Sequence, residues 1–391
     1  MRQTRKQTSQ RTIWLSLFLG AILFEASPAT AAFGSTIPEA NPIQTNTVQS
    51  QTIAGAGTVG DKNGPAPSAT FRQPMGIAVH SDGSASIADS SNQLIRKVTN
   101  NTVNTYAGLS ISRDAKGFPE GTLLDGPLHQ SMFQQPQGLD VDREGNLYVA
   151  DAENHSIRKI TPQGVVTIAG DGVQGYQDGR EEKARFHSPA DVAVAEDGTI
   201  YVADTLNHAI RKITPKGKVT TLNRVSERIV ALSSGYVERA GDYQDGKLSE
   251  AKFNEPSGIA IDAQGNLYVS DSGNQRIRYI DLKNETVTTV AGEPTLAYPP
   301  ASFYAEGALE DGEAGKAKFQ FPKGIAVTAE GGLVIADSVN HAIRYLHGGT
   351  VTTLATSFDT PVDVDVDAQG NIWVVDSGAN AILQLQIPEK K

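Results

Sequence analysis

The sequence predicts an all-β protein, specifically a six-bladed β-propeller of four-stranded antiparallel blades, and three observations lead to this fold. Residues 135–170 read as four short strands in succession, because apolar and polar residues alternate between turn signals. A pattern of Pro, Asp and Arg at fixed spacing recurs along the chain. The last copy of the pattern lacks a fourth strand, and a strand of matching pattern lies near the N-terminus instead.

The four strands of the first of these segments are expected at Gly138–Asp142, Asn146–Asp151, Ser156–Ile160 and Val165–Ala169. The breaks between them have turn chemistry: a Gly at 145, an Asn at 154 and a Pro-x-Gly at 162–164. A single meander of this kind has two apolar faces and cannot bury either one alone. It therefore requires neighbours of the same type.

The chain supplies these neighbours at unequal intervals. An Asp follows each opening Pro by fifteen residues, and an Arg follows five of the six Asp by seven, with Leu383 in the last copy. The Pro residues are Pro74, Pro136, Pro189, Pro256, Pro322 and Pro361; the Asp residues are Asp89, Asp151, Asp204, Asp271, Asp337 and Asp376; the Arg residues are Arg96, Arg158, Arg211, Arg278 and Arg344. Connections of very different length favour a propeller over a solenoid, whose pitch would fix the period.

Ring closure is expected between the two ends of the chain. The sixth unit stops after its third strand, Ala381–Gln386, whereas Ser50–Gly55 resembles the outermost strand of the other units. The N-terminal strand is therefore predicted to complete the last blade and to remove an open sheet edge that would promote aggregation.

These blocks also carry a family resemblance. Segments 256–280 and 201–213 resemble NHL repeats, whose Asn-His-Leu triplet is represented here by Asn154-His155-Ser156, Asn207-His208-Ala209 and Asn340-His341-Ala342. The resemblance covers the chain after residue 50 and implies a propeller. For function it leaves enzymes, receptors, RNA binders and scaffolds open.

The N-terminal region is predicted to be an export signal followed by a linker. Residues 1–31 combine a basic start, an apolar run at Ile13–Phe24 and an A-x-A site cut near Ala31. That run is shorter than the ~20 residues that span a bilayer. We expect a signal peptide at 1–31, a linker at 32–49 and the propeller at 50–391, in a protein that is secreted, extracellular or periplasmic and not inserted in the membrane.

Charge and composition limit the classes of partner and of chemistry that we expect. The net charge is −10, and loss of the signal takes it to −13, which counts against nucleic-acid and anionic-lipid partners. The chain has no Cys, so neither a disulfide framework nor a catalytic thiol is available. We expect a monomer that binds a protein, a peptide or a glycan.

The predicted strand connectivity places the long connections on one face of the propeller. In an up-and-down blade the Asn-His turns and the inter-blade connections emerge together on what we call the loop-rich face. An Asx-Gly pair precedes a Phe in five of these connections, which predicts a turn and a short helical turn that pin each loop to the next blade. The Phe residues are Phe71, Phe133, Phe186, Phe253 and Phe319.

Most candidate chemical groups have a structural explanation as well. The Asp and Arg of each blade should form a partly buried ion pair, because catalysis has no use for five equivalent copies. His155, His208 and His341 occupy equivalent turns, where hydrogen bonding of the turn explains them better than a metal site does. A role of these histidines at the loop-rich face stays open.

Departures from the repeat are more informative. The innermost strands usually read Gly-Ile-Ala-Val, but Asp140, Asp191, Asp363 and Asp365 replace the Gly or the Ala. Carboxylates near a propeller axis lie close together and require water, a shared proton or a cation such as Ca²⁺. Hydration is the simpler explanation, and no cofactor is required.

Two functions follow from these features. We expect a binding module whose loops 109–135, 224–255 and 293–321 present Tyr236, Tyr243, Tyr298, Phe303 and Tyr304 to a ligand. The alternative is a metal-dependent lyase or lactonase-type hydrolase with a divalent cation on the four channel aspartates. The sequence contains none of the motifs G-x-S-x-G, H-E-x-x-H or a phosphate-binding Gly loop. An enzyme is therefore the less favoured hypothesis, and no catalytic residue is assigned. A third possibility is a fragment of a larger surface protein.

Overall fold

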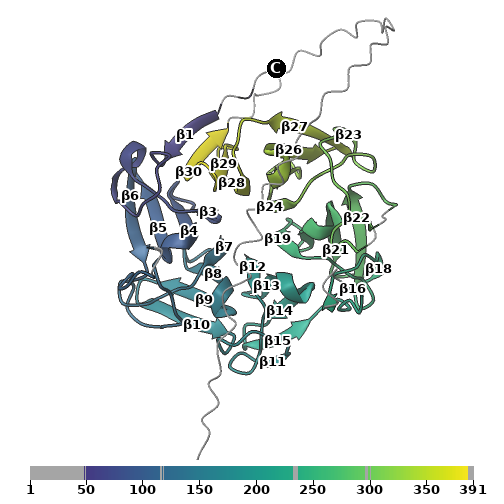
Figure 1. Cartoon of the computed structure of the whole chain (residues 1–391), viewed down its shortest axis with the longest axis horizontal. Helices are drawn as coiled ribbons and strands as arrows, with labels where there is room; N and C mark the ends of the chain where they lie inside the picture. The colour runs from purple at the N-terminus through teal and green to yellow at the C-terminus, as the bar shows by residue number, and fades with distance from the viewer. Residues whose placement is uncertain are drawn as a thin grey trace, which may run out of the picture. The chain divides into compact units, whose positions relative to one another are not determined.

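The computed structural model describes residues 48, 50–114, 117, 119–231, 237–295, 298–299 and 301–385. The described chain forms six blades arranged in a ring, with the innermost strand of each blade at the axis (Figure 1). The six-bladed fold class expected from the sequence is thus confirmed. The predicted signal peptide and nearly all of the linker lie outside the described residues.

Each blade is an antiparallel meander running outward from the axis. Blade one comprises β3 (Gly76–Val79), β4 (Ala85–Asp89), β5 (Leu94–Thr99) and β6 (Thr102–Ala107); blade two β7 (Pro136–Val141), β8 (Leu147–Asp151), β9 (Ser156–Thr161) and β10 (Gly164–Ala169); blade three β12 (Pro189–Val194), β13 (Ile200–Asp204), β14 (Ala209–Ile213) and β15 (Lys218–Thr221). Blade four comprises β19 (Pro256–Ile261), β20 (Leu267–Asp271), β21 (Arg276–Asp281) and β22 (Thr286–Ala291); blade five β24 (Pro322–Val327), β25 (Leu333–Asp337), β26 (Ala342–His347) and β27 (Thr350–Ala355); blade six β28 (Pro361–Val366), β29 (Ile372–Asp376), β30 (Ala381–Leu385) and β1 (Ser50–Ala54).

The ring closes as predicted. β1 pairs antiparallel with β30, with Thr52 opposite Leu383 and Ala54 opposite Ile382, so blade six has the strand order β1-β30-β29-β28. Figure 1 shows the purple N-terminal strand beside the yellow C-terminal one. The backbone N–H of Gly55, just after β1, donates to the carbonyl of Ala66 at 2.9 Å. The N-terminal strand therefore joins blade six to blade one.

The connections contain short elements that the sequence did not predict. Four two-residue strands pair with the outermost strands of their blades, and a separate hairpin stands between blades three and four. The four strands are β2 (Gly64–Pro65), β11 (Gly179–Arg180), β18 (Gly246–Lys247) and β23 (Gly312–Glu313); the hairpin is β16 (Ile229–Ala231) with β17 (Val237–Arg239). The Gly of an Asx-Gly pair opens each of the four two-residue strands. These glycines have positive φ angles, which residues with a side chain rarely adopt.

Short 3-10 turns between the second and third strands of blades one to five mark the loop-rich face. They are η3 (Ser90–Asn92), η4 (Ala152–Asn154), η5 (Thr205–Asn207), η6 (Ser272–Asn274) and η7 (Ser338–Asn340). A further 3-10 turn, η2 (Ala66–Ser68), lies beside the β5–β6 turn, where Ala66 N donates to the carbonyl of Asn101 at 2.9 Å. Among the described residues no helix has the length and apolarity needed to cross a bilayer.

The hydrophobic core lies in the seams between blades. The five predicted Phe residues are fully buried, and each packs with strands of the blade that it precedes and of the neighbouring blade. Phe358 occupies the corresponding place before blade six and is 7% exposed, although the short connection there has no Asx-Gly pair. One buried Phe thus packs in the seam between each blade and its neighbour.

Candidate functional site

The Asp and Arg of the repeat form buried ion pairs in five blades. In blade two, Arg158 Nη1 lies 2.5 Å from Asp151 Oδ2, and both side chains are 0% exposed. The equivalent pairs are Arg96–Asp89, Arg211–Asp204, Arg278–Asp271 and Arg344–Asp337. The predicted ion pair is therefore present, and it is fully buried.

A second acidic residue joins four of these pairs from the preceding loop. Arg158 Nη2 donates to Asp125 Oδ1 at 2.8 Å, while the same arginine donates to the carbonyls of Met132 and Leu124. Asp178, Asp245 and Asp311 contact their arginines likewise, and Asn63 does so in blade one. The Asx of each loop thus fixes the loop to the blade, a role that the sequence analysis did not assign. Such repeated contacts are structural.

Two of the three histidines in the Asn-His turns accept hydrogen bonds in contacts between blades. His208 follows η5 in the left-handed conformation, and its Nδ1 accepts a hydrogen bond from the backbone N–H of Glu255 in the next blade at 3.0 Å. His155 Nδ1 accepts from Ser188 N at 3.2 Å in the same way. In other blades the acceptor is Gln93, Gln275 or Asn380. We call these five residues, together with His341 at the equivalent place in blade five, the cap residues.

The cap contacts explain why His, Gln and Asn replace one another in this position. Each side chain can place an acceptor atom in front of the same backbone N–H group. His341 is the exception, because its Nδ1 contacts the carbonyl of Asp359 in the short connection to blade six. Burial, together with the nearby Arg228 and His187, lowers the pKa of His208 to about 4, so the ring stays neutral and able to accept.

The four channel aspartates join adjacent blades at the axis. Asp363 accepts from Val364 N of its own strand and from Ile77 N of blade one, both at 2.9 Å. Asp191 bridges to Ile259 in blade four in the same way. Asp140 and Asp365, which replace the Ala, bridge to Val194 and Val79. Each carboxylate therefore uses both oxygens on backbone donors.

The channel aspartates also act on one another. Burial raises the pKa of Asp363 to about 8 and that of Asp140 to about 7, and the charge of Asp365 adds to both shifts. Burial and the charge of Asp363 raise the pKa of Asp191. The described residues contain no group of three or more His, Asp or Glu side chains arranged to hold a metal ion. The site offers these carboxylates to backbone N–H groups, and a Ca²⁺ ion would have to share them.

Two long loops of the loop-rich face are tied together by Arg228. Its guanidinium donates to the carbonyl of Ser302 at 2.9 Å and to that of Phe303 at 2.6 Å, and it lies 3.8 Å from the centre of the Tyr298 ring. Tyr298 Oη in turn donates to Asn274 Oδ1 at 2.5 Å. Loop 224–255 and loop 293–321 therefore form one braced unit over blade four, which the sequence could not show.

The braced loops bring charged and aromatic side chains to the channel mouth. Tyr304 Oη donates to Glu255 Oε1 at 3.1 Å, and the Tyr304 ring meets Phe321 edge-on with centroids 4.9 Å apart. Lys323, in the innermost strand of blade five, interacts electrostatically with Glu255. We call Glu255, Tyr304, Phe321 and Lys323 the mouth cluster. All four side chains are half-buried.

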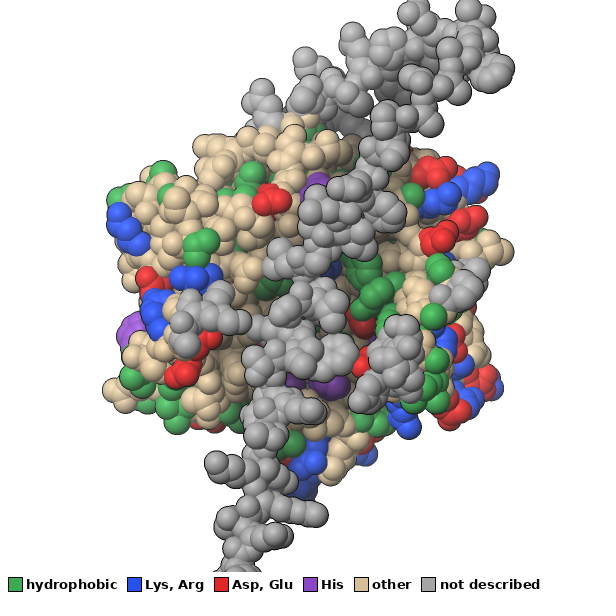
Figure 2. Space-filling model, viewed as in Figure 1, with side chains coloured by type: hydrophobic (Ala, Val, Ile, Leu, Met, Phe, Trp, Pro, Cys, Tyr) green, Lys and Arg blue, Asp and Glu red, His purple; other side chains and the backbone are tan. Residues whose placement is uncertain are grey.

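Burial perturbs the titration of the mouth cluster. It raises the pKa of Glu255 to about 7, against the opposing effects of the Tyr304 hydroxyl and of Lys323. It lowers the pKa of Lys323, which the negative charge of Glu255 opposes. Perturbed acids and bases that lie together in a mouth are typical of binding and catalytic sites. Figure 2 shows histidine, acidic and hydrophobic side chains near the middle of the face in view.

The other predicted aromatic residues have structural partners. The Tyr243 ring lies between Arg276 and Arg278, at 4.3 and 4.7 Å from their guanidinium carbons. Phe303 lies beside Tyr304 with centroids 6.2 Å apart. Tyr236 lies outside the described residues. Glu255 and Lys323 were not predicted as site residues, although both interrupt the repeat. Other blades carry Gln, Ser, Phe or Thr before the Pro, and Met, Gln, Ala, Ser or Val after it.

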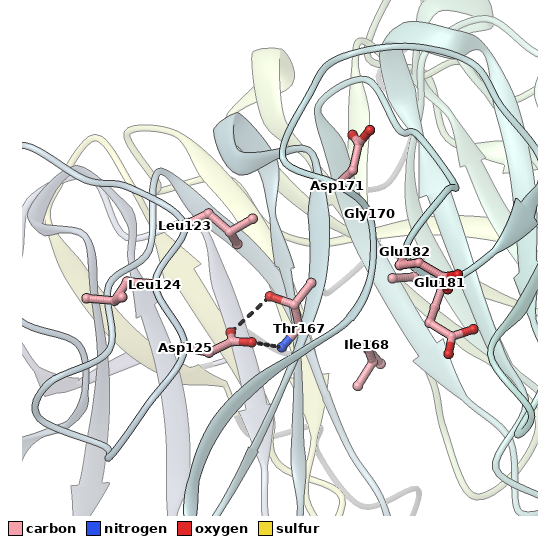
Figure 3. A pocket seen from close by; sticks show the side chains of 10 residues that line it. Leu123, Leu124, Asp125, Thr167, Ile168, Gly170, Asp171, Glu181 and Glu182 are labelled. Atoms are coloured by element: carbon pink, nitrogen blue, oxygen red, sulfur yellow. Dashed lines mark hydrogen bonds between the residues drawn. The ribbon is translucent and has the colours of Figure 1, made fainter.

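A groove on the outer rim has a different character. It has a volume of about 410 Å³ and lies between blades two and three, lined by Leu123, Leu124, Asp125, Thr167, Glu181 and Glu182, among others. Figure 3 shows the Asp125 carboxylate turned towards Thr167, whose N–H and hydroxyl both donate to it at 2.9 Å. Because Asp125 also binds Arg158, it belongs to the structural ion pairs.

Comparison with known proteins agrees with this architecture. The NHL repeat family model matches residues 133–160, 186–213, 253–278 and 319–344, which begin at the buried Phe residues before blades two to five. The human NHL repeat-containing protein 2 is 31% identical over 265 residues, covering 62% of this chain and 35% of that protein. The chloroplastic Protein SUPPRESSOR OF QUENCHING 1 of Arabidopsis thaliana is 28% identical over 314 residues, covering 63% and 29%. The chain spans about a third of the length of these relatives.

Solved structures share the fold at low identity. An auxiliary nutrient binding protein from Bacteroides thetaiotaomicron has a TM-score of 0.57 and 13% identity, covering 89% of this chain and 78% of that one. Virginiamycin B lyase from Staphylococcus aureus has a TM-score of 0.51 and 15% identity, covering 87% and 99%. Propellers of this shape thus include both binding proteins and enzymes, and the likeness extends to the fold alone.

Proposed function

The chain is an NHL-repeat β-propeller, and because this fold does not fix a function by itself, we propose one from its channel mouth: an exported binding module that takes a protein, peptide or glycan ligand on the loop-rich face. The mouth cluster of Glu255, Tyr304, Phe321 and Lys323 is the observation that carries this proposal.

The composition of the mouth cluster suits ligand recognition. A half-buried acid and a half-buried amine cost stability, since burial penalises the charged form of each. The repeat avoids this cost elsewhere by placing neutral side chains in the equivalent positions. Aromatic surface beside convergent polar groups is the usual make-up of a ligand pocket.

The braces support the same function. Arg228 fixes the carbonyls of residues 302 and 303, so Tyr304 is held before a ligand arrives. A preorganised contact surface loses little conformational entropy on binding. Nothing in this arrangement requires a metal ion.

A binding screen tests the proposal. The purified chain is applied to an oligosaccharide array and to a peptide array, and the strongest hit is titrated by calorimetry against the wild type, Tyr304→Phe and Lys323→Ser. Ser257 occupies the position of Lys323 in blade four, so that exchange suits the fold. Gln135→Ala, at the position of Glu255 in blade two, is the matched control.

We expect the hit to bind Tyr304→Phe and Lys323→Ser at least tenfold more weakly, which is about 1.4 kcal/mol. Gln135→Ala should bind like the wild type. Absence of any hit on both arrays, or equal binding by all four proteins, would overturn the proposal.

The metal-dependent lyase or lactonase remains the rival function. It rests on Asp140, Asp191, Asp363 and Asp365, whose oxygens already accept backbone hydrogen bonds. Calorimetric titration with Ca²⁺ and Zn²⁺ separates the two functions. Tight binding that is lost in Asp140→Ala and Asp365→Ala would favour the enzyme, and these exchanges restore the Ala found in the other blades.

A further inference from the structure

Arg276 is an exception among the residues that follow the cap residues. It opens β21 in blade four, and its side chain is buried, with 2% of the residue exposed. The other five blades carry small or apolar residues in this position: Leu94, Ser156, Ala209, Ala342 and Ala381. A guanidinium stays charged at any physiological pH, so its burial demands a compensating partner.

The hydrogen bonds that Arg276 makes with described residues do not use Nη1. Nε donates to the carbonyl of Asn274 at 2.9 Å, and the guanidinium stacks on Tyr243. Nη1 is buried and has no hydrogen-bond partner among the described residues. The repeated arginines differ, because both of their Nη atoms have acceptors and only Nε lacks one in four of them. Arg276 therefore lacks the carboxylate that each of those arginines possesses.

The nearby carboxylates are occupied by other cations. Asp271 and Asp245 both bind Arg278, at 2.5 and 2.6 Å. Asp242 binds Lys252 at 2.7 Å. Arg228 donates to carbonyl oxygens, which carry no full charge to neutralise it. Among these groups, four cations thus share three carboxylates, in a protein whose net charge is −10.

The braced loops cover this site. Ala305 N donates to the carbonyl of Gly273 at 3.0 Å, and Gln275 Nε2 donates to the carbonyl of Ala305 at 3.2 Å. Tyr298, which donates a hydrogen bond to Asn274, interacts electrostatically with both Arg228 and Arg276. Water is largely excluded there, so an anion that reached the guanidinium would be bound by a strong, charge-assisted hydrogen bond.

We propose that the guanidinium of Arg276 is the binding site of a small oxyanion, that is, a carboxylate, phosphate or sulfate group. The anion supplies the acceptor that Nη1 lacks and the charge that blade four lacks. This site is separate from the mouth cluster, and its existence does not depend on the proposed function. If Arg276 served only to pack against Tyr243, its stability contribution would be independent of anions.

Anion-dependent melting of the full chain tests the site. Unfolding temperature is measured by differential scanning calorimetry during titration with sodium sulfate, sodium phosphate or sodium acetate, against sodium chloride at equal ionic strength. The variant is Arg276→Ala, since blades three, five and six carry Ala in this position. Arg143→Ala, at an exposed ion pair with Glu196, is the control, and Arg276→Met replaces the Ala variant should that one not fold.

For the wild type and Arg143→Ala we expect a saturable rise in unfolding temperature with at least one of the three oxyanions, because a ligand that binds only the folded state stabilises it. The variants at Arg276 should lose the saturable part and keep the shallow, linear effect that salts have on all proteins. The inference is overturned if sulfate, phosphate and acetate all act like chloride on the wild type, or if the variants at Arg276 respond as the wild type does.

Discussion

Removal of Asp151 should destabilise the propeller more than removal of the corresponding Asp376 in blade six. Asp151→Ala leaves the fully buried Arg158 without its closest counter-charge. Breaking a buried ion pair on one side costs about 3–5 kcal/mol in the free energy of unfolding. For a domain of this size the unfolding entropy converts that loss into a fall of about 4–7 °C in unfolding temperature.

Blade six supplies a natural control for this comparison. There Leu383 stands where the other blades have Arg, and Asp376 accepts from the backbone N–H groups of residues 359 and 360, each at 2.8 Å. Asp376→Ala removes these hydrogen bonds but leaves no buried cation without its counter-charge. Its cost should be about 1–3 kcal/mol, the penalty for buried donors left unpaired.

A double-mutant cycle separates charge from packing. Arg158→Leu imitates blade six, and the double variant Asp151→Ala/Arg158→Leu removes both charges. Because Arg158 without Asp151 is the costly species, the double variant should be more stable than the sum of the single effects predicts, with a coupling of at least about 1 kcal/mol. Chemical denaturation monitored by circular dichroism measures all four proteins. Additivity within about 0.5 kcal/mol, or an Asp151→Ala cost no larger than that of Asp376→Ala, would refute the account.

Three further outcomes follow from the contacts between blades. A chain starting at residue 57 should melt well below one starting at residue 47, because only the longer one retains β1; equal melting would contradict closure by this strand. His208→Gln should keep the cap contact but remove the pH dependence of its contribution to stability. In the wild type the pKa of His208 is lowered to about 4, so the stability that it contributes above its unfolded pKa is lost as pH falls from about 6.5 to 4. Identical melting curves of the two proteins over this pH range would count against the acceptor role. Gly324→Ala should cost about 1–3 kcal/mol or more in thermal unfolding, because a Cβ there would meet Asp363 Oδ1 at 1.9 Å, whereas Gly315→Ala, with nothing within 4 Å, should be nearly neutral.

The candidate site is only partly encoded in patterns that can be read along the chain. The channel aspartates and Tyr304 stand out in sequence, the former as departures from a repeat and the latter as an aromatic residue in a long loop. Glu255 and Lys323 also interrupt the repeat, but nothing local shows that they act on each other from adjacent blades. The role of Arg228 in joining the two loops is hidden entirely, since its acceptors at residues 302 and 303 lie more than seventy residues further along the chain.

The sequence by itself determined the six blades, the identity of their strands, the Asp–Arg pairs and the closure of the ring by an N-terminal strand. The blades, strands and ion pairs depend on alternation, turn residues and spacings within one repeat, and such short-range patterns can be read from the linear order of residues. Closure follows from the missing fourth strand of the last unit and the matching strand near the N-terminus. Only the tertiary structure decided that His208 accepts from Glu255, that Asp363 bonds Ile77 across 286 residues, and that Arg276 is buried without an acceptor. Those contacts join different blades or loops, and they exist only because the closed ring brings distant segments to the same seam.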